Sequence, residues 1–135
     1  MHSIVGVPAG KATDGVDWFG VIPPDRMAEV YRNADLFIFP TRYESFGLVV
    51  IEAMAAGLPV IVSDNIGAGL VTHGRNGVVI SDYDPSHYAE ALRHLAPPAT
   101  RAVIAEANTE DVRRFSVDST VSGYTAVVES LAGSQ

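Results

Sequence analysis

The chain has 135 residues, 47% hydrophobic and 19% charged, which predicts one folded domain over residues 1–132 with a tail at 133–135. The formal net charge of −7 argues against nucleic acid as a partner, because phosphate backbones are bound by basic patches. The absence of cysteine excludes a disulfide scaffold and a thiolate metal site. The four histidines lack ligand spacing, so we expect no metal.

Nothing in the sequence predicts insertion into a membrane. The longest apolar tract, residues 47–62, contains Glu52 and is shorter than a helix that spans a bilayer. No basic segment followed by an apolar stretch comes after Met1, so we expect no signal peptide. The sequence therefore predicts a cytoplasmic protein without a transmembrane segment.

From residue 18 onward, short apolar runs alternate with amphipathic stretches, which is the pattern of a parallel α/β sheet. Strands are predicted at residues 18–19, 36–39, 60–63 and 78–80. Helices are predicted at residues 24–34, 48–56, 85–95, 99–114 and 117–131. Gly57 is placed to end the second of these helices, Asp84 to cap the third, and Ser116 to cap the last. Strand 36–39 is apolar throughout, so we expect helices to cover both of its faces.

The N-terminal arm, residues 1–16, does not fit this pattern. Residues 4–7 read as a strand, yet only residues 8–17, rich in glycine and proline, separate them from the strand at 18–19. A parallel crossover usually needs at least about 10–12 residues and a helix. We therefore expect the first strand to be antiparallel, unpaired or borrowed by a neighbouring molecule, with a dimer that exchanges residues 3–7.

The most informative segment joins the strand at 36–39 to the helix that opens at Leu48. It carries Glu44 and Gly47, and Glu52 follows on the helix. A helix that starts directly after a strand presents bare N–H groups to an anion, which suits phosphate. The helix is apolar nearly all round and is expected to be buried, so the lone Glu52 carboxylate needs hydrogen-bond donors such as ribose hydroxyls. A loop acid or a helix cap is the structural alternative for Glu44, and backbone amides of a neighbouring loop are the alternative partners for Glu52.

The run E-S-F-G-L-V-V-I-E-A-M-A-A-G-L-P-V-I-V-S-D resembles the E-x7-E signature of retaining glycosyltransferases with the GT-B fold, closest to glycosyltransferase family four. The resemblance extends over residues 16–95 and, more loosely, 115–131. It implies the C-terminal half of such an enzyme, a three-layer Rossmann-like parallel sheet that lacks its first strand and helix. It also implies a missing N-terminal Rossmann domain, which would carry the acceptor and a catalytic histidine.

The resemblance implies a role for each matching residue. Glu44 would lie by the donor sugar as the catalytic carboxylate, and Glu52 would bind ribose. The base loop would comprise Gly20, Val21 and Ile22. The donor sugar and diphosphate would be bound by Ser45, Phe46, Gly47, Leu48 and Val49. The substrate would be a nucleotide-diphosphate-sugar of the UDP or GDP type, with no further cofactor.

Basic residues that bind phosphate in the family have no counterpart here. Lys11 is the only lysine, and its surroundings do not match. Arg42 lies in the acidic loop and could approach a phosphate, although an exposed surface arginine is the ordinary interpretation. Helix amides are then the main expected contact for an anion.

Three readings remain open. The first is the donor-binding half of a retaining glycosyltransferase, inactive alone, that transfers a sugar to an acceptor hydroxyl when joined to its N-terminal domain, and peripheral to a membrane in the intact enzyme. The second is a standalone, non-catalytic nucleotide-sugar-binding or interaction module. The third, an unrelated receiver-like domain, lacks the downstream lysine that such domains use.

Overall fold

The computed structural model describes residues 2–5, 15–65 and 69–132, with backbone alone for part of both ends. The chain divides into two compact units, Met1–Asn33 and Ala34–Gln135. The single domain expected over residues 1–132 stays a prediction.

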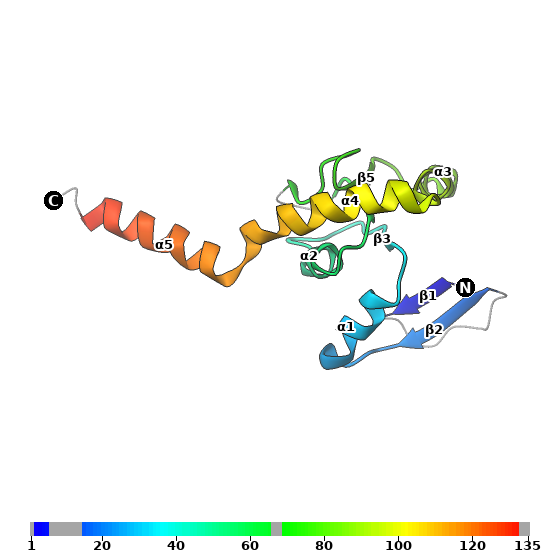
Figure 1. Cartoon of the computed structure of the whole chain (residues 1–135), viewed down its shortest axis with the longest axis horizontal. Helices are drawn as coiled ribbons and strands as arrows, with labels where there is room; N and C mark the ends of the chain where they lie inside the picture. The colour runs from blue at the N-terminus through cyan, green and yellow to red at the C-terminus, as the bar shows by residue number, and fades with distance from the viewer. Residues whose placement is uncertain (1, 6–14, 66–68, 133–135) are drawn as a thin grey trace. The chain divides into compact units, whose positions relative to one another are not determined.

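The first unit consists of strand β1 (His2–Val5), strand β2 (Val16–Gly20) and helix α1 (Pro24–Arg32) (Figure 1). Strands β1 and β2 pair in parallel, with His2 opposite Val16 and Ile4 opposite Trp18. The expectation of an antiparallel, unpaired or borrowed first strand was therefore wrong, and the exchange of residues 3–7 between chains loses its basis. Dimerisation itself stays a prediction.

The length of the connection explains this pairing. Ten residues separate Val5 from Val16, and an extended chain of that length reaches roughly 33 Å. A strand of four residues is only about 13 Å long, so the connection can return to the start of a parallel neighbour. Most of the connection, residues 6–14, lies outside the described residues.

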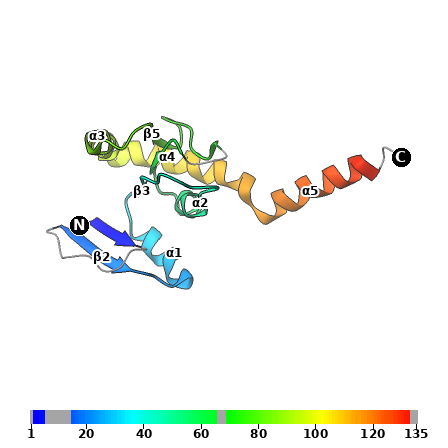
Figure 2. The ribbon, with the colours of Figure 1, turned by 180° about the vertical axis from the view of Figure 1, so that it is seen from behind.

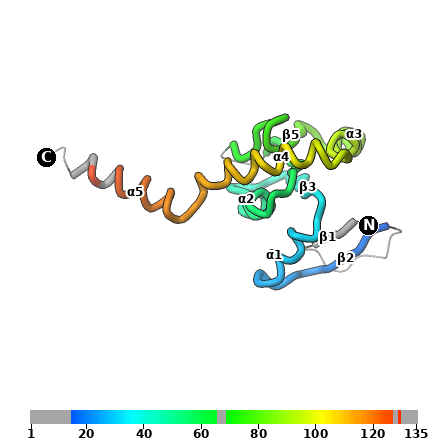
Figure 3. Tube along the Cα trace, viewed as in Figure 1, coloured from blue at the N-terminus to red at the C-terminus, as the bar shows by residue number. Residues whose placement is uncertain are grey.

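The second unit begins with an alternation of strands and helices and ends in helices (Figures 1 and 3). Its elements are β3 (Phe37–Phe39), α2 (Leu48–Ala55), β4 (Val60–Ser63), β5 (Gly77–Ile80), α3 (Pro85–Leu95), α4 (Pro98–Asp111), the 3-10 turn η2 (Val112–Phe115) and α5 (Val117–Ala132). The predicted elements are confirmed in type and order, with ends that match or differ by at most three residues. The last turn of the predicted helix 99–114 is the separate η2, and the predicted strand 18–19 is the longer β2.

Strands β3, β4 and β5 form a parallel sheet with β4 in the centre. Phe39 pairs with Val62, and Ser63 pairs with Ile80. This register brings the carboxyl ends of the three strands to one edge, as expected from their parallel direction. The predicted parallel α/β arrangement is confirmed for these strands.

The core of the second unit lies on the central strand. All four residues of β4 are buried, and Ile61 packs in a cluster with Ile80, Ala91, Leu95 and Ile104 from β5, α3 and α4. Figures 1 and 2 show α3 beside the start of α4, in agreement with the contacts between these helices. Burying such apolar side chains supplies most of the favourable free energy of folding.

The helix ends follow the sequence. Gly57 has φ +78°, and its N–H donates to the Met54 carbonyl at 2.9 Å while the Leu58 N–H donates to the Ala53 carbonyl at 3.0 Å. These two bonds form a Schellman motif, which requires the left-handed conformation that glycine adopts freely. The Asp84 carboxylate accepts from the Ser86 N–H at 2.9 Å, as the predicted N-cap of α3. The Ser116 hydroxyl accepts from the Ser119 N–H at 3.1 Å at the start of α5.

Two expectations about burial were wrong. Helix α2 buries only Val50, Ala53 and Met54, whereas Glu52 and Leu48 are exposed. Strand β3 is half-buried along its length, because β4 takes the central position in the sheet. The apolar stripe of α5 is exposed at Val117, Val121 and Tyr124, while the side chains of Val128 and Leu131 lie outside the described residues.

Within the described ranges, no helix combines the length and the apolar character that crossing a bilayer requires.

Candidate functional site

The candidate site is the acidic loop, residues 40–47, which connects β3 to α2 at the carboxyl edge of the sheet. The segments that follow β4 and β5 lie at the same edge, because Phe39, Val62 and Val79 share one row of the parallel register. In open α/β sheets, ligands bind outside the carboxyl ends of the strands. The fold therefore places the acidic loop where a ligand site is expected.

Gly47 sets the geometry at the start of α2. It is the N-cap residue with φ +82°, ψ +43°, in the left-handed region that costs a side-chain-bearing residue strain. Its carbonyl accepts from the N–H groups of Val50 at 2.9 Å and Ile51 at 3.2 Å, which closes the first turn. The N–H groups at the very start of a helix point out of its end, which is where an anion can bind.

The Glu44 carboxylate already binds part of this turn. Its Oε1 accepts from the N–H of Gly47 at 3.2 Å and from the N–H of Phe46 at 3.3 Å. Among the described residues, no donor is recorded to Oε2, and the residue is half-buried. The structure thus shows that two successive N–H groups of the loop donate to an anionic oxygen. Glu44 therefore makes the contacts that the structural alternative, a cap at the start of the helix, would give it.

The other predicted donor-binding residues lie in the same turn. Ser45, Phe46 and Leu48 are exposed, and Val49 is half-buried. The Phe46 ring contacts the Phe115 ring edge-to-face, with 6.3 Å between centroids. Phe115 belongs to η2, so an aromatic contact joins the acidic loop to the segment before α5.

Glu52 lies in the second turn of α2, one turn beyond the amides at the helix start. Its predicted burial was wrong, because the covered face of α2 runs through Val50, Ala53 and Met54. An exposed carboxylate carries no desolvation cost that a ligand must offset. The prediction that a buried Glu52 needs ribose hydroxyls as donors therefore loses its basis. The prediction of ribose binding now depends only on the position of Glu52.

The predicted base loop belongs to the first unit. Gly20 ends β2 with φ +63°, Val21 is strongly exposed, and Ile22 is half-buried. Glu44 and Glu52 belong instead to the second unit.

The structure also reveals polar residues that sequence reasoning missed. The Thr41 carbonyl accepts from the Ser63 hydroxyl at 2.5 Å and from the Tyr83 hydroxyl at 3.0 Å. The Asn65 side-chain amide donates to the Arg42 carbonyl at 3.2 Å and to the Tyr83 hydroxyl. Each of these groups lies at or just beyond the end of a parallel strand. That shared position was the available signal in the sequence.

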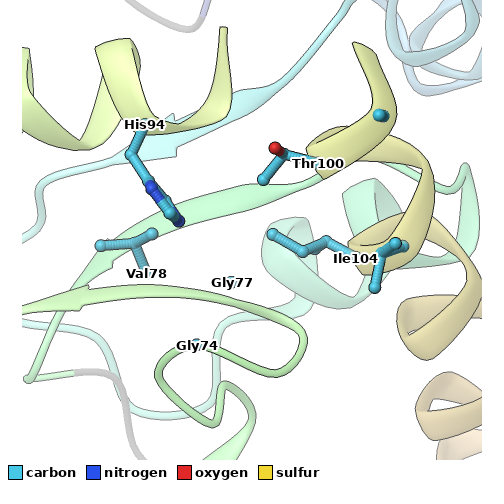
Figure 4. A pocket seen from close by; sticks show the side chains of 8 residues that line it. Gly74, Gly77, Val78, His94, Thr100 and Ile104 are labelled. Atoms are coloured by element: carbon cyan, nitrogen blue, oxygen red, sulfur yellow. The ribbon is translucent and has the colours of Figure 1, made fainter. Parts of the chain in front are cut away.

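A shallow hollow elsewhere on the second unit contains none of the predicted site residues (Figure 4). It is formed by β5 and the segment from the end of α3 into α4. Its lining is mostly small or apolar: Gly74, Gly77, Val78, His94, Ala99, Thr100, Val103 and Ile104. We assign it no part in the site, because it lies along the flank of β5 rather than beyond the carboxyl ends of the strands.

No group of three potential metal ligands occurs among the described residues.

Residues 4–97 match the protein family described as Glycosyl transferases group 1. The chain is similar to the D-inositol 3-phosphate glycosyltransferase of Acidothermus cellulolyticus, with 38% identity over 117 residues, covering 84% of this chain and 26% of the relative. The chain thus spans about a quarter of the length of this curated relative.

Solved structures agree with this family. Sucrose-phosphate synthase from Thermosynechococcus elongatus matches with a TM-score of 0.80 and 27% identity over 98% of this chain and 39% of that one. The Anabaena protein HepE, crystallised with UDP-glucose, matches with a TM-score of 0.72 and 26% identity over 87% of this chain and 32% of that one. The chain belongs to the glycosyl transferases group 1 family, and its fold is that of the C-terminal domain of a GT-B glycosyltransferase.

Proposed function

We propose that the acidic loop and the start of α2 bind a nucleotide-diphosphate-sugar, the donor half of a sugar-transfer reaction. The observation that carries the proposal is the position of Gly47. Its left-handed conformation opens α2 at the carboxyl edge of a parallel sheet, with the amides of the turn already holding an anionic oxygen. The structural likeness to HepE, whose crystals contain UDP-glucose, supports a donor of the UDP type.

In this proposal the diphosphate binds at the amides of Gly47, Leu48 and Val49. A phosphate oxygen competes with Glu44 Oε1 for the Gly47 N–H, because both need the same donor. The Glu44 carboxylate then accepts from hydroxyls of the donor sugar. A fixed carboxylate near the anomeric carbon stabilises the positive charge that develops there during transfer.

Ser45 and Phe46 complete the contacts to the donor sugar, and Glu52 accepts from the ribose hydroxyls. Exposure of Glu52 is compatible with this role, because an accessible carboxylate on the second turn of α2 can meet the sugar that precedes the diphosphate. The contact of Gly20, Val21 and Ile22 with the base stays a separate prediction, because these residues belong to the first unit.

Transfer itself needs an acceptor site, which we assign to an N-terminal Rossmann domain. The chain covers only 26% of its D-inositol 3-phosphate glycosyltransferase relative. Joined to such a domain, this chain would supply the donor and the partner would supply the acceptor hydroxyl.

Calorimetric titration with UDP, GDP and inorganic pyrophosphate tests the binding. Glu52→Ala should weaken the preferred nucleoside diphosphate by about tenfold, the cost of losing a hydrogen bond to a charged group, and leave pyrophosphate unchanged. Glu106→Ala removes another exposed carboxylate, on α4, and serves as the matched control. Equal losses for both ligands would remove Glu52 from the ribose, and no binding of any nucleotide would contradict the proposed function.

A further inference from the structure

Three strand ends converge on one short stretch of the acidic loop, Thr41 and Arg42. Ser63, at the end of β4, and Tyr83, beyond β5, both donate to the Thr41 carbonyl. Asn65 donates to the Arg42 carbonyl and to the Tyr83 hydroxyl. The main chain on either side of the Arg42 α-carbon is therefore held by side chains from the end of β4 and from the segments that follow β4 and β5.

The Arg42 side chain is held as well. Its guanidinium carbon lies 4.3 Å from the centre of the Tyr83 ring, within the range of a cation–π contact. A free arginine side chain loses roughly 2 kcal/mol of rotamer entropy when it is ordered. Much of this cost is met before any ligand binds, because Tyr83 already limits the positions of the guanidinium. Stacking on a ring face also leaves the N–H groups at the edge of the guanidinium able to donate.

The charge on Arg42 is not neutralised within the described residues. Ion pairs there engage Arg26, Arg75 and Arg101, but none engages Arg42. The nearest acid in sequence, Glu44, is turned to the amides of Phe46 and Gly47. Arg42 is thus an exposed arginine whose guanidinium is stacked on a ring and has no carboxylate partner among the described residues. Arg42 also lies in the acidic loop, at the edge of the sheet where a ligand is expected to bind.

We propose that Arg42 is an anion-binding residue of this site that receives a phosphate group of the ligand, and that Tyr83 and Asn65 are its positioning residues. This inference rests on the proposed function and adds the cation that the helix amides lack. The planar guanidinium donates to two phosphate oxygens at once, which gives it an advantage over an ammonium group.

Two sources of the phosphate share this chemistry. One is the diphosphate of the donor, which would bind the amides of α2 and Arg42 together. The other is a phosphomonoester on the acceptor, which would bind Arg42 while the donor occupies the amides. Glycerol 3-phosphate, titrated into protein saturated with nucleoside diphosphate, is the probe that distinguishes them.

The experiment compares Arg42→Gln with Arg93→Gln by calorimetry, with inorganic pyrophosphate as the first ligand. Arg93 lies in the last turn of α3, about 12 Å along the helix from its start, so it is a charge-matched control away from the edge. We expect Arg42→Gln to weaken pyrophosphate by at least about tenfold and Arg93→Gln to change it little. Arg42→Lys, which keeps the charge but loses the planar fork, should fall between wild type and Arg42→Gln.

Positioning by Tyr83 is tested through coupling. Tyr83→Leu should weaken pyrophosphate in the wild-type background and have no further effect in the Arg42→Gln background, because it acts through Arg42. Tyr83→Phe keeps the ring and should lose less affinity than Tyr83→Leu. A merely structural role for Tyr83 would lower affinity equally in both backgrounds, and that result would overturn its positioning role.

The remaining outcomes separate this inference from the proposed function. Pyrophosphate binding that depends on Arg42 without any nucleotide binding would support the inference and contradict the proposed function. Nucleotide and pyrophosphate binding that both survive Arg42→Gln, together with no binding of glycerol 3-phosphate that depends on Arg42, would overturn the inference alone. Failure of wild-type protein to bind either pyrophosphate or glycerol 3-phosphate at millimolar concentration would also overturn it. A monoester that binds the nucleotide-saturated protein through Arg42 identifies the second source, and its absence identifies the first.

Discussion

The buried sheet and the acidic loop of the second unit are stabilised by different interactions. In the sheet, β4 is fully buried and packs through Ile61 against α3 and α4. In the loop, the main-chain carbonyls of Thr41 and Arg42 accept hydrogen bonds from Ser63, Asn65 and Tyr83. Apolar packing fixes where the loop starts and ends, whereas polar contacts fix its shape. Stability and ligand binding should therefore respond to different substitutions.

The largest expected effect is on the sheet. Leu95 of α3 is fully buried in the core cluster, so Leu95→Ala should lower the free energy of unfolding by about 2–5 kcal/mol, through lost burial and the cavity left behind. Leu48→Ala, at a leucine 63% exposed beside the acidic loop, should change stability little. Urea denaturation of both variants measures the contrast, and equal losses would contradict it.

Gly77 tests the close contact between β5 and β4. A β-carbon there would lie 2.6 Å from the Val60 carbonyl oxygen and 2.8 Å from Val71 Cγ1. Gly77→Ala should therefore destabilise the protein by about 1–3 kcal/mol, because the two strands must separate. Gly123→Ala, in helix α5 with no atom within 4 Å, should instead stabilise by about 0.5–1 kcal/mol. Thermal unfolding of the two variants should give shifts of opposite sign.

Two left-handed glycines at the ends of α2 allow stability and binding to be separated. Gly47 and Gly57 have φ +82° and +78°, so alanine at either position should cost about 1–2 kcal/mol of stability. Only Gly47→Ala should also weaken pyrophosphate, because Gly47 lies in the acidic loop and Gly57 lies at the opposite end of the helix. If Gly57→Ala weakened the ligand as much, the effect would be global rather than local.

The smallest expected effect concerns an exposed pair at the start of α3. The Asp82 carboxylate accepts a hydrogen bond from His87 Nδ1 at 2.9 Å, which raises the pKa of His87 and lowers the pKa of Asp82. The stability contributed by His87 is thus fully present below its unfolded pKa, about 6.5, and is lost as pH rises through the raised folded value. Asp82→Asn should lower the pKa of His87 toward its ordinary value in an NMR titration. The same change at exposed Asp118 should not move it.

The arrangement of strands and helices could be predicted because local patterns determined it. Residues 60–63 form an apolar run that is buried in the structure as β4, and Gly57 ends α2 as its backbone freedom suggests. The face of α2 could not be predicted, because a helix apolar nearly all round does not show which side the sheet will cover. Glu52 was therefore predicted to be buried and is exposed.

The chemistry of the loop was only partly accessible from the sequence. Glu44 and Gly47 were predicted to share a turn, and the structure brings them together through a hydrogen bond. Tyr83 was missed because it lies 42 positions after Thr41, and only the register of three strands brings them together. The parallel pairing of β1 was missed because a parallel crossover was expected to need about 10–12 residues and a helix. A strand of only four residues needs a shorter connection to return to its start.

The Thr41 carbonyl has a consequence for the order of folding. Its two donors lie 22 and 42 residues further along the chain. Closing such distances costs conformational entropy, which pairing of β3 with β4 and of β4 with β5 must first offset. The acidic loop can thus take its hydrogen-bonded shape only after the sheet has assembled. In the folded protein it can open while the sheet stays intact, so its amides should exchange hydrogen with solvent faster than those of β4.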